Sequence, residues 1–137
     1  MKNIIILSVF IFSFLTSIKA EKPETFAHEY NKVSFFSDKE GEFGPFVSWK
    51  TTFVYNYKGT SDILIKMPDY DPIILTPILD KVTEHETDKG IKFQYMKYID
   101  DSGNIVELYF YDSIKRTMLV MSDAVFLFAK SSSYPEI

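Results

Sequence analysis

Short segments in which apolar and polar residues alternate, separated by frequent turn residues, restrict this chain to a small group of folds. The clearest of these segments is Ser48 to Tyr57. One face of it would carry Trp49, Thr51, Phe53, Tyr55 and Tyr57. This period of two is that of a β-strand, because successive side chains of a strand point to opposite faces of the sheet. Lys58 to Ser61 predicts a turn into a second alternating segment, Asp62 to Met67, so the two segments should form a hairpin.

A second hairpin is indicated nearer the C-terminus. Ile91 to Ile99 and Ile105 to Tyr111 are rich in aromatic and β-branched residues, and Asp100 to Asn104 between them is a strong turn sequence. The second of these strands has one wholly apolar face, made by Val106, Leu108 and Phe110. Its opposite face carries Ile105, Glu107, Tyr109 and Tyr111.

The region between the two hairpins is less regular. Pro68 to Pro72 must be a loop because its two prolines remove backbone donors, and Ile73 to Thr76 is expected to resume as a strand. The stretch Pro77 to Lys89 follows a capping threonine, begins with proline and precedes a glycine, all of which suit a helix. Its apolar spacing stops after one turn, however, so we favour a strand that ends in a hairpin turn at Asp88 to Gly90, with one short helix as the alternative.

The C-terminal segments Thr117 to Met121 and Ala124 to Phe128 are apolar on both faces, so something must cover their second face. Glu24 to Phe36 is one candidate, since apolar residues recur in it at helical spacing. These residues are Phe26, Tyr30 and Val33. The alternative is that the sheet curls into a closed barrel.

Together these segments predict one all-β, mainly antiparallel domain over residues 21–137. Roughly six to eight strands in a meander would form a small barrel or a two-layer sandwich, since either arrangement removes unpaired sheet edges. The tail Lys130 to Ile137 contains three serines and a proline and is expected to be frayed.

The first twenty residues have the pattern of a signal peptide. Lys2 gives a positive start, Ile4 to Leu15 is an apolar stretch, and Ala20 is a small residue for cleavage. The apolar stretch is too short to span a bilayer, which needs roughly 20 residues. We therefore expect export, to a periplasm or to the medium, with no membrane span after cleavage.

Few residues of this chain are suited to catalysis. It has two histidines and no cysteine, so disulfides, thiolate metal ligands and a cysteine nucleophile are excluded. His85 stands between two glutamates, but strand alternation would place it on the face opposite to both of them. His28 has apolar neighbours that suit a structural role. We expect no catalytic residue, no metal site and no cofactor.

Acidic pairs are the remaining candidates for chemistry. Asp69 with Asp71 and Asp100 with Asp101 lie in turn sequences, where such residues supply local hydrogen bonds, and neither pair matches a calcium-binding loop. The net charge of −4 argues against nucleic acid as a partner, because phosphate neutralisation requires a basic surface.

The aromatic content is the most informative feature for function. The chain has nine tyrosines, thirteen phenylalanines and one tryptophan. If the sheet order is sequential, two groups of rings would lie across from each other and could bind a ligand or a partner. The candidate binding residues are Trp49, Phe53, Tyr55, Tyr57, Tyr95, Tyr109 and Tyr111. Core packing and cross-strand pairing are the simpler explanation of the same rings.

Three hypotheses for function follow. The first is a non-enzymatic module that binds a protein partner or serves as an accessory factor of the cell envelope. The second is a carrier whose barrel holds a small apolar ligand against aromatic rings, namely Phe53, Tyr55, Phe93 and Phe110. The third, a hydrolase that uses one of the acidic pairs, has the least support because no catalytic motif accompanies them.

Overall fold

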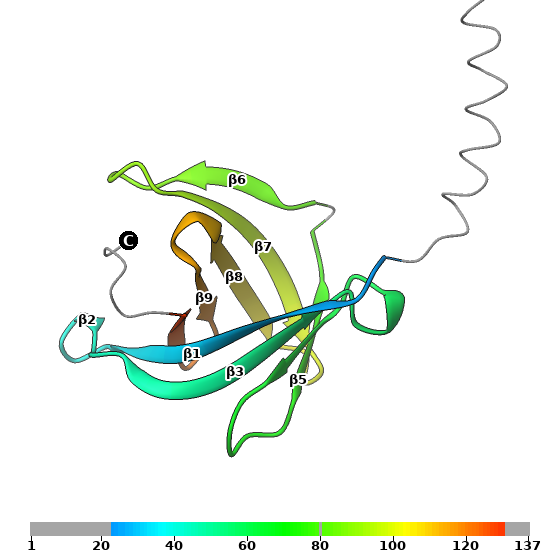
Figure 1. The fold of residues 1–137 in the computed structure, drawn as a ribbon, viewed down its shortest axis with the longest axis horizontal. Coiled ribbons are helices and arrows are strands. Elements are labelled where there is room, and N and C mark those ends of the chain that lie inside the picture. Colours follow the sequence, from blue (N-terminus) through cyan, green and yellow to red (C-terminus); the bar gives the residue numbers. More distant parts are fainter. Residues whose placement is uncertain (1–22, 80, 131–137) are drawn as a thin grey trace, which may run out of the picture.

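The computed structural model describes residues 23–79 and 81–130, and it is built almost entirely of antiparallel β-strands (Figure 1). The strands are β1 (Phe26–Ser37), β2 (Glu42–Phe43), β3 (Val47–Tyr55), β4 (Ile63–Lys66), β5 (Ile73–Pro77), β6 (Thr83–Glu86), β7 (Lys92–Asp100), β8 (Ile105–Tyr111), β9 (Arg116–Val120) and β10 (Val125–Ala129). Two 3-10 turns complete these elements, η1 (Tyr57–Gly59) and η2 (Asp112–Ile114). The expected all-β antiparallel fold is confirmed.

Eight of the strands close into a barrel. Their order around the wall is β1, β3, β4, β5, β7, β8, β9 and β10, and β10 pairs with β1 to close the ring. The closing register runs from Lys32 opposite Ala129 to Phe35 opposite Phe126. Both predicted hairpins, β3–β4 and β7–β8, are present. Closure pairs the strand edges that an open meander would leave exposed. Of the two predicted arrangements, the structure is therefore the barrel and not the two-layer sandwich.

The core fills the centre of the barrel with side chains from the inward face of each strand. Its fully buried members, with no more than 2% of their surface exposed, include Val33, Phe53, Ile65, Leu75, Val106, Leu108, Leu119 and Phe128. Phe53 lies at the centre of an aromatic group, with ring centroids 5.5 Å from Tyr30 and 5.4 Å from Phe128. The wholly apolar face predicted for β8 is the face that points inward.

Two short strands lie outside the barrel ring. β2 pairs with the end of β1, and β6 pairs with the first part of β7. All four residues of β6 are exposed, and Figure 1 shows the β6–β7 hairpin arching away on the side opposite β1 and β3. The preference for a strand over a helix in Pro77 to Lys89 is confirmed, although the strand spans only Thr83–Glu86. The predicted turn at Asp88 to Gly90 is also present, with Gly90 at a φ of +83°.

The helical spacing in Glu24 to Phe36 does not indicate a helix, because this segment is strand β1. In a regular strand, Tyr30 and Val33 would face opposite sides, since they are three residues apart. Both are in the core, at 4% and 0% exposure, because the pairing of β1 with β3 shifts register between Tyr30 and Lys32. A β-bulge therefore produced the apparent helical period.

The segment that follows β1 contacts β1 itself and one residue of β9. Ser34 Oγ donates a 2.7 Å hydrogen bond to the Gly44 carbonyl, and the Arg116 guanidinium lies 5.0 Å from the centre of the Phe46 ring. The first contact holds the segment against β1, and the second places Phe46 against the β9 residue Arg116. The predicted signal peptide, residues 1–20, and the tail after Lys130 lie outside the described residues.

Candidate ligand cavity

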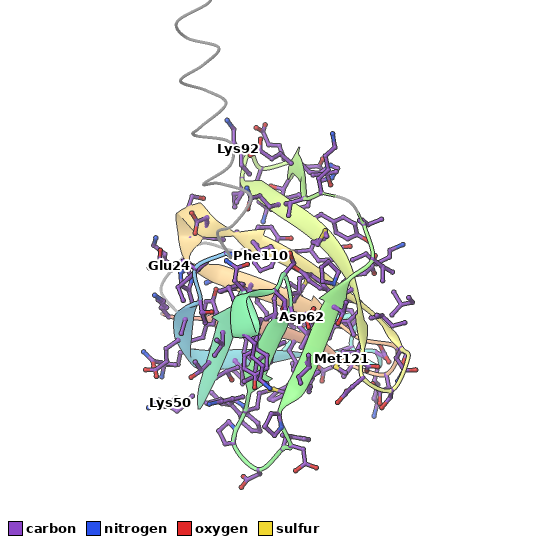
Figure 2. All side chains as sticks on the ribbon, turned by 90° about the vertical axis from the view of Figure 1, so that its right-hand side faces the viewer. Glu24, Lys50, Asp62, Lys92, Phe110 and Met121 are labelled. Atoms are coloured by element: carbon purple, nitrogen blue, oxygen red, sulfur yellow. The ribbon has the colours of Figure 1, made fainter. Side chains whose placement is uncertain are left out.

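One end of the barrel is open because its strands have unequal lengths. β5 leaves β7 at Pro77, which pairs with Tyr98, whereas β7 itself begins at Lys92 and pairs with β8 as far as Gln94. The wall is therefore incomplete at this end, and a cavity of about 420 Å³ opens there. Figure 2 shows Lys92 and Phe110 toward this end and Met121 toward the opposite end.

The cavity has an aromatic and aliphatic wall contributed by five segments of the chain. Its apolar surface comes from Phe26, Tyr30, Tyr55, Val82, Tyr98 and Phe110. The rings of Tyr55 and Phe110 are neighbours, with centroids 6.1 Å apart and planes tilted by 58°, and Phe26 stacks on Tyr55 at 5.0 Å. Phe26 and Val82 are 48% and 43% exposed, so they form an apolar rim.

A second hollow of about 370 Å³ adjoins the first, beneath the β6–β7 hairpin. Both hollows are lined by Gln94, Phe110 and Asp112. The second is also lined by Glu84 and Lys92. We refer to these two adjoining hollows together as the funnel.

Hydroxyl groups gather on the inner surface of the cavity. The hydroxyls of Tyr30 and Thr117, which come from opposite ends of the sequence, share a 2.6 Å hydrogen bond. The Tyr55 hydroxyl lies close enough to both of them to interact. Tyr98 is only 6% exposed and also lines the cavity, yet its hydroxyl makes no hydrogen bond to the described part of the chain.

The buried tyrosines are held in their neutral form. Desolvation raises the pKa of Tyr98 to about 12, and it also raises the pKa of Tyr30 and, strongly, that of Tyr55. The nearby Tyr30 and Tyr98 groups add to the shift at Tyr55. Tyrosine is neutral at pH 7 even with its ordinary pKa of about 10, and burial extends the neutral form of these phenols to higher pH.

Charged residues surround the mouth of the cavity. Lys115, Lys130 and Asp112 line it, and the backbone N–H of Lys130 donates to the carbonyl of Lys115 at 3.4 Å, so the two lysines are neighbours. Lys115 has a left-handed conformation with a φ of +54°, at the end of η2. Arg116 also lines the cavity, but its guanidinium packs on Phe46.

The opposite end of the barrel is closed by aromatic rings. Trp49 packs edge-on against Phe35 at 5.8 Å and lies 6.1 Å from Tyr70, while Phe35 packs against Phe126 at 5.3 Å. Tyr70 comes from the loop between β4 and β5, so it closes the end of the barrel from outside the strands.

Six of the seven predicted binding residues lie on the inner or the outer face of the barrel wall, and Tyr57 lies on neither. Trp49, Phe53 and Tyr55 point inward, but only Tyr55 lines the cavity. The left-handed Asn56 ends β3 before Tyr57, which lies in η1 and is not on the strand face predicted for it. Tyr57 therefore joins neither group.

The three remaining predicted residues, Tyr95, Tyr109 and Tyr111, lie on the outer face of β7 and β8. They form an aromatic cluster with Phe93 and His85, in which Phe93 is 5.4 Å from His85 and 5.2 Å from Tyr111. Tyr95 also donates a hydrogen bond to Glu107. Phe93, expected inside a carrier barrel, is thus on the outside, because Gln94 is the residue that pairs with inward-facing Phe110.

Several cavity residues were not singled out from the sequence. Tyr98 and Gln94 could have been placed by alternation, since they fall on the face of β7 opposite Phe93 and Tyr95. Tyr30 and Thr117 could not, because they meet only through the closure of β1 against β10.

The acidic and histidine motifs have local structural roles. The Asp100 carboxylate accepts hydrogen bonds from the backbone N–H groups of Ser102 and Asn104, and His85 shares one with Thr83. Over residues 23–79 and 81–130, no three His, Cys, Asp or Glu side chains gather as metal ligands would. Nor does this part of the chain contain a helix long and apolar enough to cross a membrane.

Comparison with known proteins adds no family to these observations. The chain matches no protein-family model, and neither curated proteins nor solved structures give a significant match. The site itself is therefore the basis on which function can be inferred.

Proposed function

We propose that this protein binds a small, largely apolar molecule in the open end of its barrel and acts as a carrier for it. The observation that carries this proposal is the cavity of about 420 Å³ above a filled core. Ligand pockets are typically about 300–1,000 Å³, with mostly apolar walls and a few placed polar groups. The rings of Tyr55 and Phe110 and the inner hydroxyls match that description.

The barrel is suited to such a role because its rigidity does not depend on the cavity. The eight-stranded ring is closed, and the packed centre lies below the open end. A ligand would therefore enter a preformed site and would need to order little of the chain, which lowers the free-energy cost of binding.

A fluorescence titration with N-phenyl-1-naphthylamine, a neutral aromatic probe, tests the proposal. We expect saturable one-to-one binding that Phe110→Ala weakens several-fold, because this ring lines the cavity. The matched control is Tyr109→Ala, since Tyr109 is the adjacent residue on the outer face and should leave binding unchanged. Absence of saturable binding, or equal effects of the two variants, would contradict the proposal.

Native mass spectrometry of gently purified protein would show whether it retains a ligand of its own.

A second candidate function is recognition of a protein partner, which the outer surface favours. The aromatic cluster of His85, Phe93, Tyr95, Tyr109 and Tyr111 lies beside β6, and within residues 23–79 and 81–130 the one strand that pairs with β6 is β7. A strand with one unpaired edge can accept a strand from another protein. Pull-down with the wild-type protein and with Tyr95→Ala tests this candidate: a partner lost specifically in the variant supports it, and an identical set of proteins argues against it.

We also propose that either function is carried out after export. The support is the pattern of residues 1–20, with one lysine before an apolar stretch and a small residue at the end. Cell fractionation, with N-terminal sequencing of the product, tests this proposal, and a cytoplasmic chain that retains Met1 would contradict it.

A further inference from the structure

We infer that the ligand is an amphipathic acid that inserts an oxygen-bearing end toward Tyr98 and leaves its acidic group between Lys115 and Lys130. This inference rests on the proposed function, because it names the class of molecule that the same cavity would select. It follows from a difference between the inner and outer polar groups of the site.

The inner group is the Tyr98 hydroxyl. Tyr98 lines the cavity, and only 6% of its surface is exposed. Its hydroxyl makes no hydrogen bond within the described part of the chain. The hydroxyls of Tyr30 and Thr117 differ in this respect, since they bond to each other. The Tyr98 hydroxyl itself is accessible from the cavity, since it is not one of the fully buried unpartnered polar atoms. A ligand oxygen could therefore accept its hydrogen bond in place of water.

The outer group is the pair of lysines at the mouth. Lys115 and Lys130 are exposed and adjacent, and Asp112 is the one acidic side chain that lines this cavity among the described residues. Even with Glu84 and Lys92 of the adjoining hollow included, the funnel carries more cationic than acidic side chains. The whole chain has a net charge of −4, so the mouth is a local exception that would favour an anion.

The surface between these two groups is aromatic. Tyr55 and Phe110 lie next to each other there with their rings tilted by 58°, and Phe26 stacks on Tyr55 near the rim. A flat apolar body between an inner oxygen and an outer acid would therefore meet complementary surface along its length. A wholly apolar molecule would leave both the Tyr98 hydroxyl and the lysines unpaired.

Three naphthalene probes that differ only in their polar groups test this inference. These are 6-hydroxy-2-naphthoic acid, which has both groups, 2-naphthoic acid, which lacks the hydroxyl, and 2-naphthol, which lacks the acid. We expect the first to bind most tightly. Tyr98→Phe should weaken 6-hydroxy-2-naphthoate about three- to tenfold and leave 2-naphthoate unchanged, since a net hydrogen bond is worth about 0.5–1.5 kcal/mol.

The double variant Lys115→Gln/Lys130→Gln should weaken both naphthoates about three- to tenfold, an effect reduced by salt, and leave 2-naphthol unchanged. The matched controls remove similar groups elsewhere. Tyr111→Phe changes a buried tyrosine on the outer face, and Lys50→Gln/Lys66→Gln removes the same charge from exposed positions of β3 and β4. Circular dichroism melting would verify that every variant is folded.

The possible failures are distinguishable. If no probe binds, and N-phenyl-1-naphthylamine does not bind either, the proposed carrier function fails. If the neutral probe binds in a Phe110-dependent manner while the three naphthalenes bind equally, the carrier function stands and the inference about ligand class is wrong. The inference about ligand class would also be wrong if the control variants weakened probe binding as much as the test variants do.

Discussion

The two ends of this barrel are built from the same strands but differ in what fills them. At the closed end, Trp49, Phe35 and Phe126 pack ring against ring, and Tyr70 covers them from a loop. At the open end, rings are also in contact, with Phe26 stacked on Tyr55 at 5.0 Å, but they line a cavity together with hydroxyl groups and lysines. The difference shows that aromatic content alone does not distinguish a packed core from a binding site.

Strand length is the physical origin of this difference. β5 ends at Pro77, while β7 and β8 continue past it, so no complete ring of strands surrounds the open end. At the closed end, Tyr70 of the loop between β4 and β5 lies against Trp49. If this account is correct, substitutions should act mainly on stability in the core and mainly on binding at the open end.

The largest expected effect comes from truncating the centre of the core. Phe53→Ala should lower the free energy of unfolding by about 3–5 kcal/mol, because Phe53 is fully buried against Tyr30 and Phe128. Phe110→Ala, at the half-buried cavity wall, should cost no more than about 2 kcal/mol. Urea unfolding measures both values. Equal costs would mean that the open end is packed as tightly as the core.

A somewhat smaller effect is expected from alkaline pH. Burial raises the pKa of Tyr98 from 10.0 to about 12, so the folded state holds this proton more tightly than the unfolded state does. The stability that the neutral phenol provides is complete below pH 10 and is lost as the pH rises from 10 to 12. The loss should be about 2–3 kcal/mol for this residue, at about 1.4 kcal/mol per pKa unit.

The measurement is the free energy of unfolding at pH 9 and at pH 12 in the wild type and in Tyr98→Phe. The variant should lose less stability over this range. Tyr70→Phe is the control, because it removes an exposed hydroxyl at the other end of the molecule. Parallel curves for the wild type and Tyr98→Phe would show that Tyr98 does not titrate as its burial predicts.

The smallest effects distinguish two buried threonines. Thr117, at the cavity, bonds to Tyr30, whereas Thr51 Oγ1 is buried and has no hydrogen-bond partner among the described residues. Thr117→Val should cost about 1 kcal/mol, and Thr51→Val should be neutral or stabilise by up to about 1 kcal/mol. Thermal melting of the two variants would check the opposite signs, and a destabilised Thr51→Val would reveal a hydrogen bond not accounted for here.

Local sequence pattern was sufficient for the fold class, the two main hairpins and the inward face of β8, because strand alternation and turn chemistry are short-range properties. Local pattern could not predict features that depend on pairing between strands far apart in the sequence. The register shift near Tyr30 resembled a helical period, and strand closure brought Thr117 to Tyr30. Tyr95 and Tyr109 were expected opposite the rings of β3, but alternation along β7 places them outside the barrel.

The most direct test of the two-ended account is a ¹⁵N–¹H correlation spectrum of the labelled protein during titration with 6-hydroxy-2-naphthoic acid. We predict that amide shifts concentrate at the open end, at His28, Gln94 and Lys115, and spare the closed end at Met67, Asp101 and Met121. Shifts centred on the closed end, or scattered evenly over the barrel, would contradict the claim that the open end is the ligand site.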